Sequence, residues 1–239
     1  MERPTNRSYT IRGSRITEAQ KAAKDALWLT YGIAYTQEKV DLSSLFPKHK
    51  KLVVEIGFGM GEATAQIAQH LPETAFVAID LHPPGIGKLL GRIDEAQLKN
   101  IKVIEEDAHM VLHYMIEDQS IDGFHLYFPD PWPKKKHNKR RIVNPEFIGV
   151  IHSKLKPGGY FHIATDWVPY AERISEVFSA SDLFTGGVVP KPEWRPLTRF
   201  EGQGLDKKHR VTDFMYFREL HLSQTYLLTR FGEYVAHHY

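Results

Sequence analysis

The chain has 239 residues, of which 42% are hydrophobic and 25% charged, so it can form one sizeable domain with short extensions. Its net charge is only +2, so any attraction to nucleic acid must come from local clusters of basic residues. It has no cysteine, which excludes disulfides, iron–sulfur clusters, cysteine-ligated zinc and a thiolate nucleophile.

The N-terminal part is predicted to be a basic arm followed by a helix. Residues 1–16 show no periodic pattern and carry the arginines Arg3, Arg7, Arg12 and Arg15. Residues 17–20 read TEAQ, which has the spacing of a capping box and predicts a helix running to about residue 31. We expect residues 1–50 to form the arm and helix, residues 51–220 the main domain, and residues 221–239 a C-terminal extension.

From residue 52 onward, short apolar or β-branched runs alternate with helical patterns. The predicted strands are residues 52–56, 75–79, 101–104, 121–128 and 160–164, and the predicted helices are residues 62–70, 87–98, 108–116 and 145–155. The glycines at 158 and 159 are expected to cap the last helix in a left-handed conformation. This alternation predicts an α/β fold, an open and mostly parallel sheet with helices on both faces. Ligands bind such sheets beyond the carboxyl ends of the strands.

The first predicted strand leads into a glycine-rich turn, EIGFGMGE at residues 55–62. Glycines let the backbone turn tightly and come close to a ligand at the start of a helix, although the turn could also simply connect strand and helix. The dinucleotide fingerprint would place a glycine at position 62, where this chain has Glu62. A carboxylate would repel a pyrophosphate, so the turn favours a cofactor with an amino group and a sulfonium charge over NAD or FAD.

Acidic residues lie at or near the ends of three successive predicted strands. Glu55 lies near the end of the first strand, Asp80 follows the second, and Asp107 follows the third. Asp80 is positioned to accept hydrogen bonds from both hydroxyls of a ribose, and Asp107 could accept one from an adenine amino group. Each acid alone could be a solvated loop residue, but the three together favour a common site.

With these positions, the chain resembles the class I S-adenosylmethionine-dependent methyltransferases over about residues 51–217. The resemblance implies a Rossmann-like fold with S-adenosyl-L-methionine as the cofactor. It also implies that the cofactor site is lined by Glu55, Gly57, Gly59, Asp80 and Asp107.

The fourth predicted strand leads into FPDPWPKKKHNKRR, residues 128–141, where Asp130 lies between two prolines and six positive charges follow within eight residues. Taken separately, the prolines could form a rigid turn around a buried tryptophan, and the charges could form a solvated loop. At the predicted ligand-binding edge, however, the charges would attract phosphates without reading sequence. The segment therefore points to a nucleic acid.

The possible methyl acceptors are limited by chemistry. Methylation of pyrimidine C5 needs a thiolate and radical methylation needs a cysteine-bound cluster, and this chain has no cysteine. Adenine amino methylases usually carry N/D-P-P-Y, from which the sequence PDPW at residues 129–132 departs. Guanine N7 already has a lone pair and no proton to lose. A carboxylate that accepts from the guanine N1–H and amino group would orient the base and stabilise its positive charge.

The segment PDPWPKKKHNKRRIV closely resembles the signature of bacterial tRNA (guanine-N7-)-methyltransferases. Further matching segments are EIGFGMG at 55–61, ATDW at 164–167, TRFE at 198–201 and the basic arm at 7–17, so the resemblance spans nearly all of residues 7–219. That family methylates the guanosine at position 46 in the variable loop of tRNA. This chain departs from it in having Asp80 where the family often has Glu, and in extending beyond the family's usual end.

The resemblance implies a role for each matching residue. Asp130 would be catalytic and would also border the cofactor. Contacts with the substrate are implied for Lys134, Asp166, Thr198, Arg199, Phe200 and Glu201. Contacts with the RNA are implied for Lys136, His137, Asn138, Lys139, Arg140 and Arg141.

Three other functions share part of this pattern. A small-molecule methyltransferase would use the same cofactor site but would not need the basic segment. An NAD-dependent oxidoreductase fits the fold but not Glu62 or the acids at the strand ends, and a non-catalytic tRNA-binding module would leave the cofactor site idle. Both a monomer and a homodimer are compatible with the sequence.

Membrane and metal binding are not expected. The chain has no apolar run of eighteen residues and no signal-like N-terminus, which predicts a cytoplasmic location. His109 and His113 lie four residues apart on a predicted helix but lack the acidic neighbour and third ligand of a zinc site.

Overall fold

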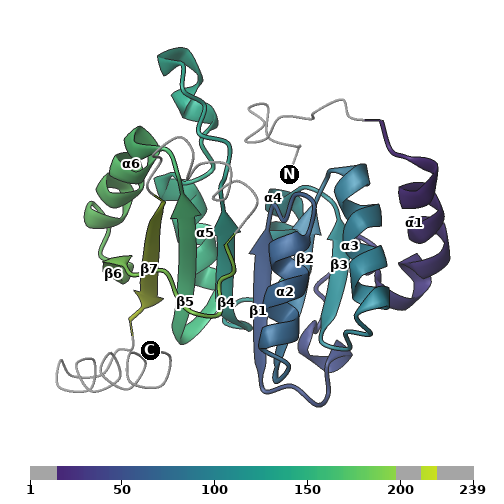
Figure 1. Ribbon diagram of the computed structural model, residues 1–239. Coiled ribbons are helices and arrows are strands. Elements are labelled where there is room, and N and C mark those ends of the chain that lie inside the picture. Colours follow the sequence, from purple (N-terminus) through teal and green to yellow (C-terminus); the bar gives the residue numbers. More distant parts are fainter. Residues whose placement is uncertain (1–14, 198–210, 220–239) are drawn as a thin grey trace.

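The computed structural model describes residues 15–197 and 211–219, which form a seven-stranded sheet in the order β3-β2-β1-β4-β5-β7-β6 (Figure 1). Strands β1 to β5 are parallel, and β7 runs antiparallel between β5 and β6. The strands are β1 (Lys51–Ile56), β2 (Thr74–Asp80), β3 (Ile101–Glu105), β4 (Ile121–Tyr127), β5 (Leu155–Thr165), β6 (Phe184–Val189) and β7 (Thr212–Arg218).

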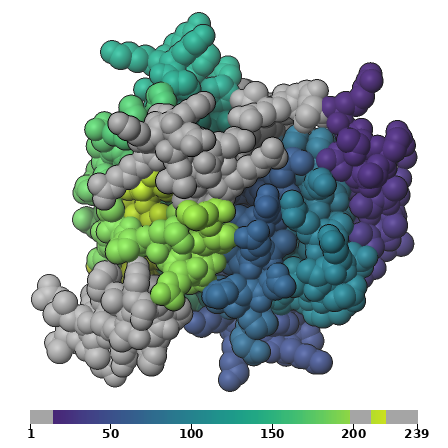
Figure 2. Space-filling model, viewed as in Figure 1, coloured from purple at the N-terminus to yellow at the C-terminus, as the bar shows by residue number. Residues whose placement is uncertain are grey.

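Helices cover both faces of the sheet. Helices α1 (Glu18–Tyr31), α2 (Glu62–His70) and α3 (Pro83–Glu95) lie on one side, with α1 packed along the outside of α3. The other side carries α4 (Ala108–Met110), the π-helical turn Val111–Met115, α5 (Pro145–Lys154) and α6 (Val168–Ser179). A short 3₁₀ helix spans Ser43–Leu45, and a second, η3 (Lys135–Arg140), projects from the body beyond β4 and appears in teal in Figures 1 and 2.

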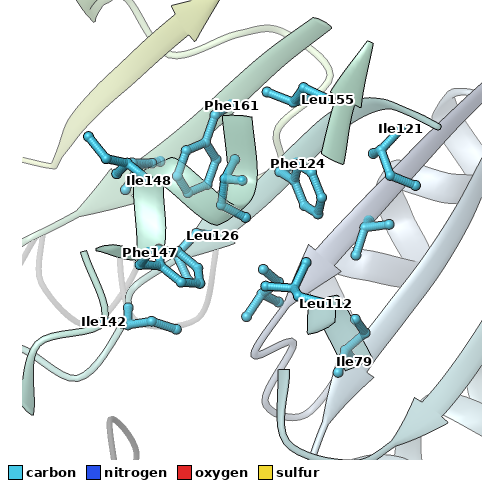
Figure 3. Packing of buried hydrophobic residues seen from close by; sticks show 14 of the residues in the cluster. Ile79, Leu112, Ile121, Phe124, Leu126, Ile142, Phe147, Ile148, Leu155 and Phe161 are labelled. Atoms are coloured by element: carbon cyan, nitrogen blue, oxygen red, sulfur yellow. The ribbon is translucent and has the colours of Figure 1, made fainter. Parts of the chain in front are cut away.

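Each face of the sheet has its own apolar cluster, because side chains alternate along each strand. On β4, Phe124 and Leu126 lie in the same cluster as Phe147 and Ile148 of α5, and the ring of Phe161 packs against both Phe124 and Phe147 (Figure 3). Burying a side chain such as Phe124 contributes roughly 1.5–3 kcal/mol to stability. The next β4 residue, Tyr127, belongs to the cluster on the opposite face.

Several predictions are confirmed. Thr17 and Gln20 form the capping box: the Gln20 amide N lies 3.2 Å from Thr17 Oγ1, and the Thr17 amide N lies 2.9 Å from Gln20 Oε1. Helix α1 begins and ends as expected, and all five predicted strands are present. The predicted α/β class, with helices on both faces of a mostly parallel sheet, is also correct.

Other boundaries were wrong. Helix α3 begins at Pro83 rather than near residue 87, because a proline fits the first helical turn, where its missing N–H has no partner to lose. The helix predicted over 108–116 is α4 followed by a π-helical turn. Helix α5 ends at the extended residue Leu155, and Gly158, with a φ of 75°, lies inside β5 beside a register shift. Strands β6 and β7 were not predicted.

Helix α1 is attached to the main body, although it was predicted together with the N-terminal arm. Lys24 forms an ion pair with Glu105 in β3, and the Tyr31 hydroxyl lies 3.3 Å from Asp94 Oδ1 in α3. Arg3, Arg7 and Arg12, the TRFE motif at 198–201 and the extension at 221–239 lie outside the described residues. Within 15–197 and 211–219, no helix has the length and apolar character needed to cross a membrane.

Candidate active site

The glycine turn between β1 and α2 forms an open backbone cradle. Gly57 and Gly59 have φ values of 74° and 60°, in the left-handed region that glycine adopts at little cost. A Cβ atom built on either residue would meet none of the described residues within 4 Å apart from its own chain neighbours, so both present bare backbone on this side of the turn. Gly61 is needed for a different reason, because its Cβ would lie 2.7 Å from the Leu89 Cβ in α3.

Glu55 lies beneath this turn and is only 2% exposed. Its Oε1 atom accepts a hydrogen bond from the Thr64 hydroxyl at 3.0 Å, whereas its Oε2 atom is buried and has no partner among the described residues. Burial raises the pKa of Glu55 to about 8, and the Thr64 hydrogen bond opposes part of that rise. A buried acceptor without a partner fits a ligand that brings an N–H donor or a positive charge, as the amino group of S-adenosylmethionine would.

Asp80 connects the end of β2 to the glycine turn. Its Oδ2 atom accepts from the Gly59 N–H at 2.8 Å, and its Oδ1 atom accepts from the Leu81 and His82 N–H groups at 2.7 and 2.9 Å. Burial raises the pKa of Asp80, while these three bonds lower it. Because a carboxylate offers about four acceptor sites, roughly one stays available. Accepting from both ribose hydroxyls would therefore require one of these backbone bonds to be released.

Asp107 has a local role at the end of β3. It is the N-cap of α4, and its side chain accepts from the His109 N–H at 2.8 Å. It is buried, and its own N–H donates to the Glu106 side chain at 2.8 Å. Its contact with an adenine amino group stays a prediction.

The loop that carries Asp130 is strained on both sides of that residue. Phe128 and Trp132 have φ values of 49° and 44°, a left-handed conformation that costs a non-glycine residue about 1–2 kcal/mol. The Phe128 N–H donates to the Ala164 carbonyl at 2.8 Å, which fixes the start of the loop to the end of β5. Asp130 is half-buried. Strain of this kind is concentrated at functional sites in proteins.

Asp130 lies close to the first turn of α6. Burial raises the pKa of Tyr170 to about 12, and the negative charge of Asp130 contributes to this rise. Asp166, which is also half-buried, follows β5 at the same edge of the sheet, because Tyr127 at the end of β4 pairs with Ala164 in β5. The fold therefore brings the chain segments that carry Asp130 and Asp166 to one edge of the sheet. The substrate residues predicted at Thr198–Glu201 lie outside the described residues.

The basic segment after this loop is largely solvent-exposed and includes η3. The side chains of Lys134, Lys136, Asn138 and Lys139 are exposed. The Arg140 guanidinium lies 4.9 Å from the centre of the Trp132 ring, and the His137 ring lies edge-on to it at 5.7 Å. Partial burial and the neighbouring charges of Arg140, Lys136 and Lys134 lower the pKa of His137, which favours its neutral form.

Arg141 differs from the rest of the predicted RNA contacts. It is only 7% exposed, and its Nε atom donates to the Pro131 carbonyl at 2.8 Å. Its side chain is therefore engaged inside the protein, and its contact with RNA stays a prediction that this geometry does not favour. A run of basic letters does not reveal which member turns inward.

A buried polar network under the β4–β5–β7 part of the sheet was not predicted. Asp213 accepts two hydrogen bonds from Arg195, from Nε at 2.7 Å and from Nη2 at 2.8 Å. The Nε2 atom of His162 lies 2.9 Å from Asp213 Oδ1, and its Nδ1 atom lies 2.9 Å from the Tyr127 hydroxyl. These residues are distant in sequence, so no local pattern could have revealed the network. Among the described residues, no three His, Asp or Glu side chains are grouped to hold a metal ion.

Solved structures with a similar fold are methyltransferases. The crystal structure of the 16S rRNA methyltransferase KamB superposes with a TM-score of 0.57 at 15% identity, covering 78% of this chain and 97% of that one. The 30S ribosomal A1408 methyltransferase from an uncultured bacterium gives a TM-score of 0.53 at 17% identity, covering 75% and 92%. At these identities the likeness concerns the fold alone, which is the Rossmann-like fold of class I methyltransferases.

Sequence comparison is more specific. A family model described as "Putative methyltransferase" matches residues 49–214. The tRNA (guanine-N(7)-)-methyltransferase of Nitrosomonas europaea is 45% identical, over 90% of this chain and 97% of its own length. The enzyme of the same name from Neisseria meningitidis serogroup B is 47% identical, over 89% and 90%. Together with the glycine turn and the Asp130 loop, these matches show that the chain belongs to the tRNA (guanine-N(7)-)-methyltransferase family.

Proposed function

We propose that this chain transfers a methyl group from S-adenosyl-L-methionine to N7 of a guanosine in tRNA, giving 7-methylguanosine. We propose that this guanosine is the one at position 46 of the variable loop, as the family resemblance implies. The observation that carries the proposal is the position of Asp130, half-buried in a strained loop at the carboxyl edge of the sheet and directly before an exposed basic segment. Such a reaction would take place in the cytoplasm, where tRNA is found.

The cofactor half of the site consists of the glycine turn and the acids around it. S-adenosylmethionine supplies a methyl group on positively charged sulfur, so it needs no metal to be reactive. We propose that Gly57 and Gly59 bring bare backbone against it and that Glu55 accepts from its amino group. Asp80, Asp107 and Asp130 would complete the contacts, within a methyltransferase domain that we place at residues 51–220.

Asp130 would act by orientation and charge rather than as a base. Guanine N7 attacks the methyl carbon with its own lone pair as the carbon–sulfur bond breaks, and no proton leaves N7. We propose that Asp130 accepts from the guanine N1–H and amino group and so stabilises the positive charge that develops on the ring. The strained conformations at Phe128 and Trp132 restrict the loop, so the carboxylate is held in place before the substrate arrives.

The basic segment would bind the tRNA backbone. The exposed side chains of Lys136 and Lys139 are free to approach phosphates, which would hold the tRNA in register without reading its sequence. Lys134, Asp166 and residues 198–201 would contact the nucleotide being modified. A small-molecule methyltransferase would not need such a projecting cationic segment.

Asp130→Asn tests this proposal, because it keeps the shape of the side chain but removes its charge and one acceptor. With tRNA and S-adenosylmethionine both saturating, we expect the single-turnover rate to fall by about 10²–10³-fold or more, as when one transition-state contact is lost. Binding of tRNA should change little. Raising the pH should not restore the rate, since no titrating base has been removed.

Asp182→Asn is the matched control, because Asp182 is an exposed carboxylate in the turn after α6. Chemical mapping of the methylated base in the wild-type product checks the acceptor atom. Near-normal turnover by Asp130→Asn would show that the two prolines hold Asp130 for structural reasons only. Absence of methylation by the wild-type enzyme would contradict the proposed function itself.

A further inference from the structure

Arg141 ends the run KKKHNKRR but does not share the environment of its neighbours. Its Nε atom donates to the Pro131 carbonyl at 2.8 Å, and its Nη1 atom lies 3.4 Å from the Pro169 carbonyl. The guanidinium also lies 5.0 Å from the centre of the Tyr170 ring. Burial lowers the pKa of Arg141, but an arginine side chain stays charged in a protein, so a buried cation faces these groups.

The partners of Arg141 belong to two different elements. Pro131 directly follows Asp130 in the loop, whereas Pro169 and Tyr170 belong to the first turn of α6. Helix α6 is firmly anchored, because Tyr170 and Ile174 are fully buried in the apolar cluster. The Tyr170 hydroxyl also accepts from the Val143 N–H at 3.2 Å, so the chain just after Arg141 is tied to α6. Arg141 therefore bridges a rigid helix and the loop that carries Asp130.

The bond to the Pro131 carbonyl acts on a specific peptide unit. Rotation of the Pro131–Trp132 peptide sets φ of Trp132, which is 44° in this structure. That conformation is intrinsically unfavourable for tryptophan, so the loop needs an external restraint to keep it. A charge-assisted hydrogen bond from Arg141 is such a restraint and is stronger than a bond between neutral groups.

We propose that Arg141 is a positioning residue for methyl transfer, which holds the Asp130 loop against α6 instead of contacting RNA. This inference rests on the proposed function of Asp130. It separates Arg141 from the exposed Lys139, two residues earlier. Lys139 would contribute to tRNA affinity, whereas Arg141 would contribute to the rate of the bound complex.

The first test compares Arg141→Met with Lys139→Met, which both replace a cation with an unbranched apolar side chain. For Arg141→Met we expect the single-turnover rate at saturation to fall about 10–100-fold. Its tRNA affinity, and the slope of log affinity against log salt, should stay as in the wild type. For Lys139→Met that slope should flatten by roughly 0.7–0.9, the effect of one lost phosphate contact. A flattened slope for Arg141→Met with an unchanged rate would overturn the inference.

A double-mutant cycle with Asp130→Asn distinguishes positioning from general damage. If Arg141 acts through Asp130, adding Arg141→Met to the Asp130→Asn enzyme should lower the rate less than twofold further. Independent effects would multiply, and that result would overturn the inference. Arg141→Lys keeps a charge that can reach one carbonyl and should restore part of the rate. It also replaces Arg141→Met in the cycle if the methionine variant does not fold.

An assay of the wild-type enzyme tests the proposed function separately from the role of Arg141. Methylation of guanine N7 by the wild type establishes the function without reference to Arg141. The variants then test Arg141 alone, by rate, salt slope and coupling to Asp130.

Discussion

Two buried carboxylates on the same face of the sheet have opposite surroundings. Asp213 in β7 is 4% exposed and meets both the forked Arg195 side chain and His162. Glu55 in β1 is 2% exposed and meets one hydroxyl, with its Oε2 atom unpartnered among the described residues. Burial by itself would raise the pKa of both, but the hydrogen bonds and charges around Asp213 outweigh it and hold the pKa of that residue below its usual value.

The difference separates structural roles from ligand-binding roles. A buried charge that the protein neutralises with its own cation needs nothing further, and removing one partner leaves an uncompensated charge. The Arg195–Asp213 pair brings together the chain on either side of residues 198–210, which include the predicted substrate motif. A buried carboxyl with an unused oxygen costs stability unless a ligand completes it, and Glu55 lies where the cofactor is proposed to bind.

The largest effect that we expect comes from breaking the Arg195–Asp213 pair. Asp213→Asn should lower the free energy of unfolding by about 3–5 kcal/mol at pH 7, because Arg195 stays buried without its counter-charge. Since the folded-state pKa of Asp213 lies below its ordinary value of 3.8, this stabilisation exists above that pH and is lost as the pH falls through the folded-state pKa. Urea unfolding of the wild type and of Asp213→Asn, at pH 7 and at pH 3, measures the loss of unfolding free energy at each pH. A loss below 1 kcal/mol at pH 7 would show that the Arg195–Asp213 pair contributes little to stability.

Glu55→Gln should have the opposite effect on stability. The folded-state pKa of Glu55, about 8, lies above its ordinary value of 4.5, so the native protein retains a proton that the unfolded chain has lost. Wild-type stability should therefore fall as the pH rises from about 4.5 to 8. Because glutamine imitates the protonated form, the variant should match the wild type at pH 5 and exceed it by roughly 2–4 kcal/mol at pH 9.

Calorimetry of the same Glu55→Gln variant should show weaker binding of S-adenosylmethionine, since glutamine cannot ionise to give the negative charge that would face the bound amino group. Equal destabilisation at both pH values would instead mean that Glu55 is needed for packing.

The smallest effect concerns Thr64, which among the described residues is the only hydrogen-bond partner of the Glu55 carboxyl group. Thr64→Val keeps the shape but removes the hydroxyl, which should cost about 0.5–1.5 kcal/mol of unfolding free energy. In the variant, the pH range over which stability falls should also extend to higher pH. The reason is that the Thr64 hydrogen bond lowers the pKa of Glu55 in the wild type. Thermal unfolding across pH 5 to 9 measures the shift. In the Glu55→Gln background no such shift should remain, and its persistence would implicate another group.

Local signals in the sequence were enough to predict the capping box at Thr17 and the glycine turn, because each depends on residues within a few positions. The burial of Arg141 could not be predicted from the sequence, because the packing of α6 decides which arginine of the run is buried. The same holds for Asp213, which lies 18 residues from its partner Arg195 and comes near His162 only when β7 pairs with β5. Gly158 was misread because a left-handed glycine suits both a helix end and an irregular strand.

The position of β7 also constrains how the protein is made. β1 to β5 are synthesised in an order that lets each parallel neighbour pair with a strand already present, but β6 pairs only with β7, which is synthesised after it. Until residues 212–218 leave the ribosome, β6 and the outer edge of β5 have no neighbour within the described sheet, and open strand edges invite pairing with other chains. The cofactor half can therefore assemble during translation, whereas completion of the sheet waits for its last strand. A nascent chain that stalls before residue 212 would expose two such edges, so we expect it to be a target for chaperones.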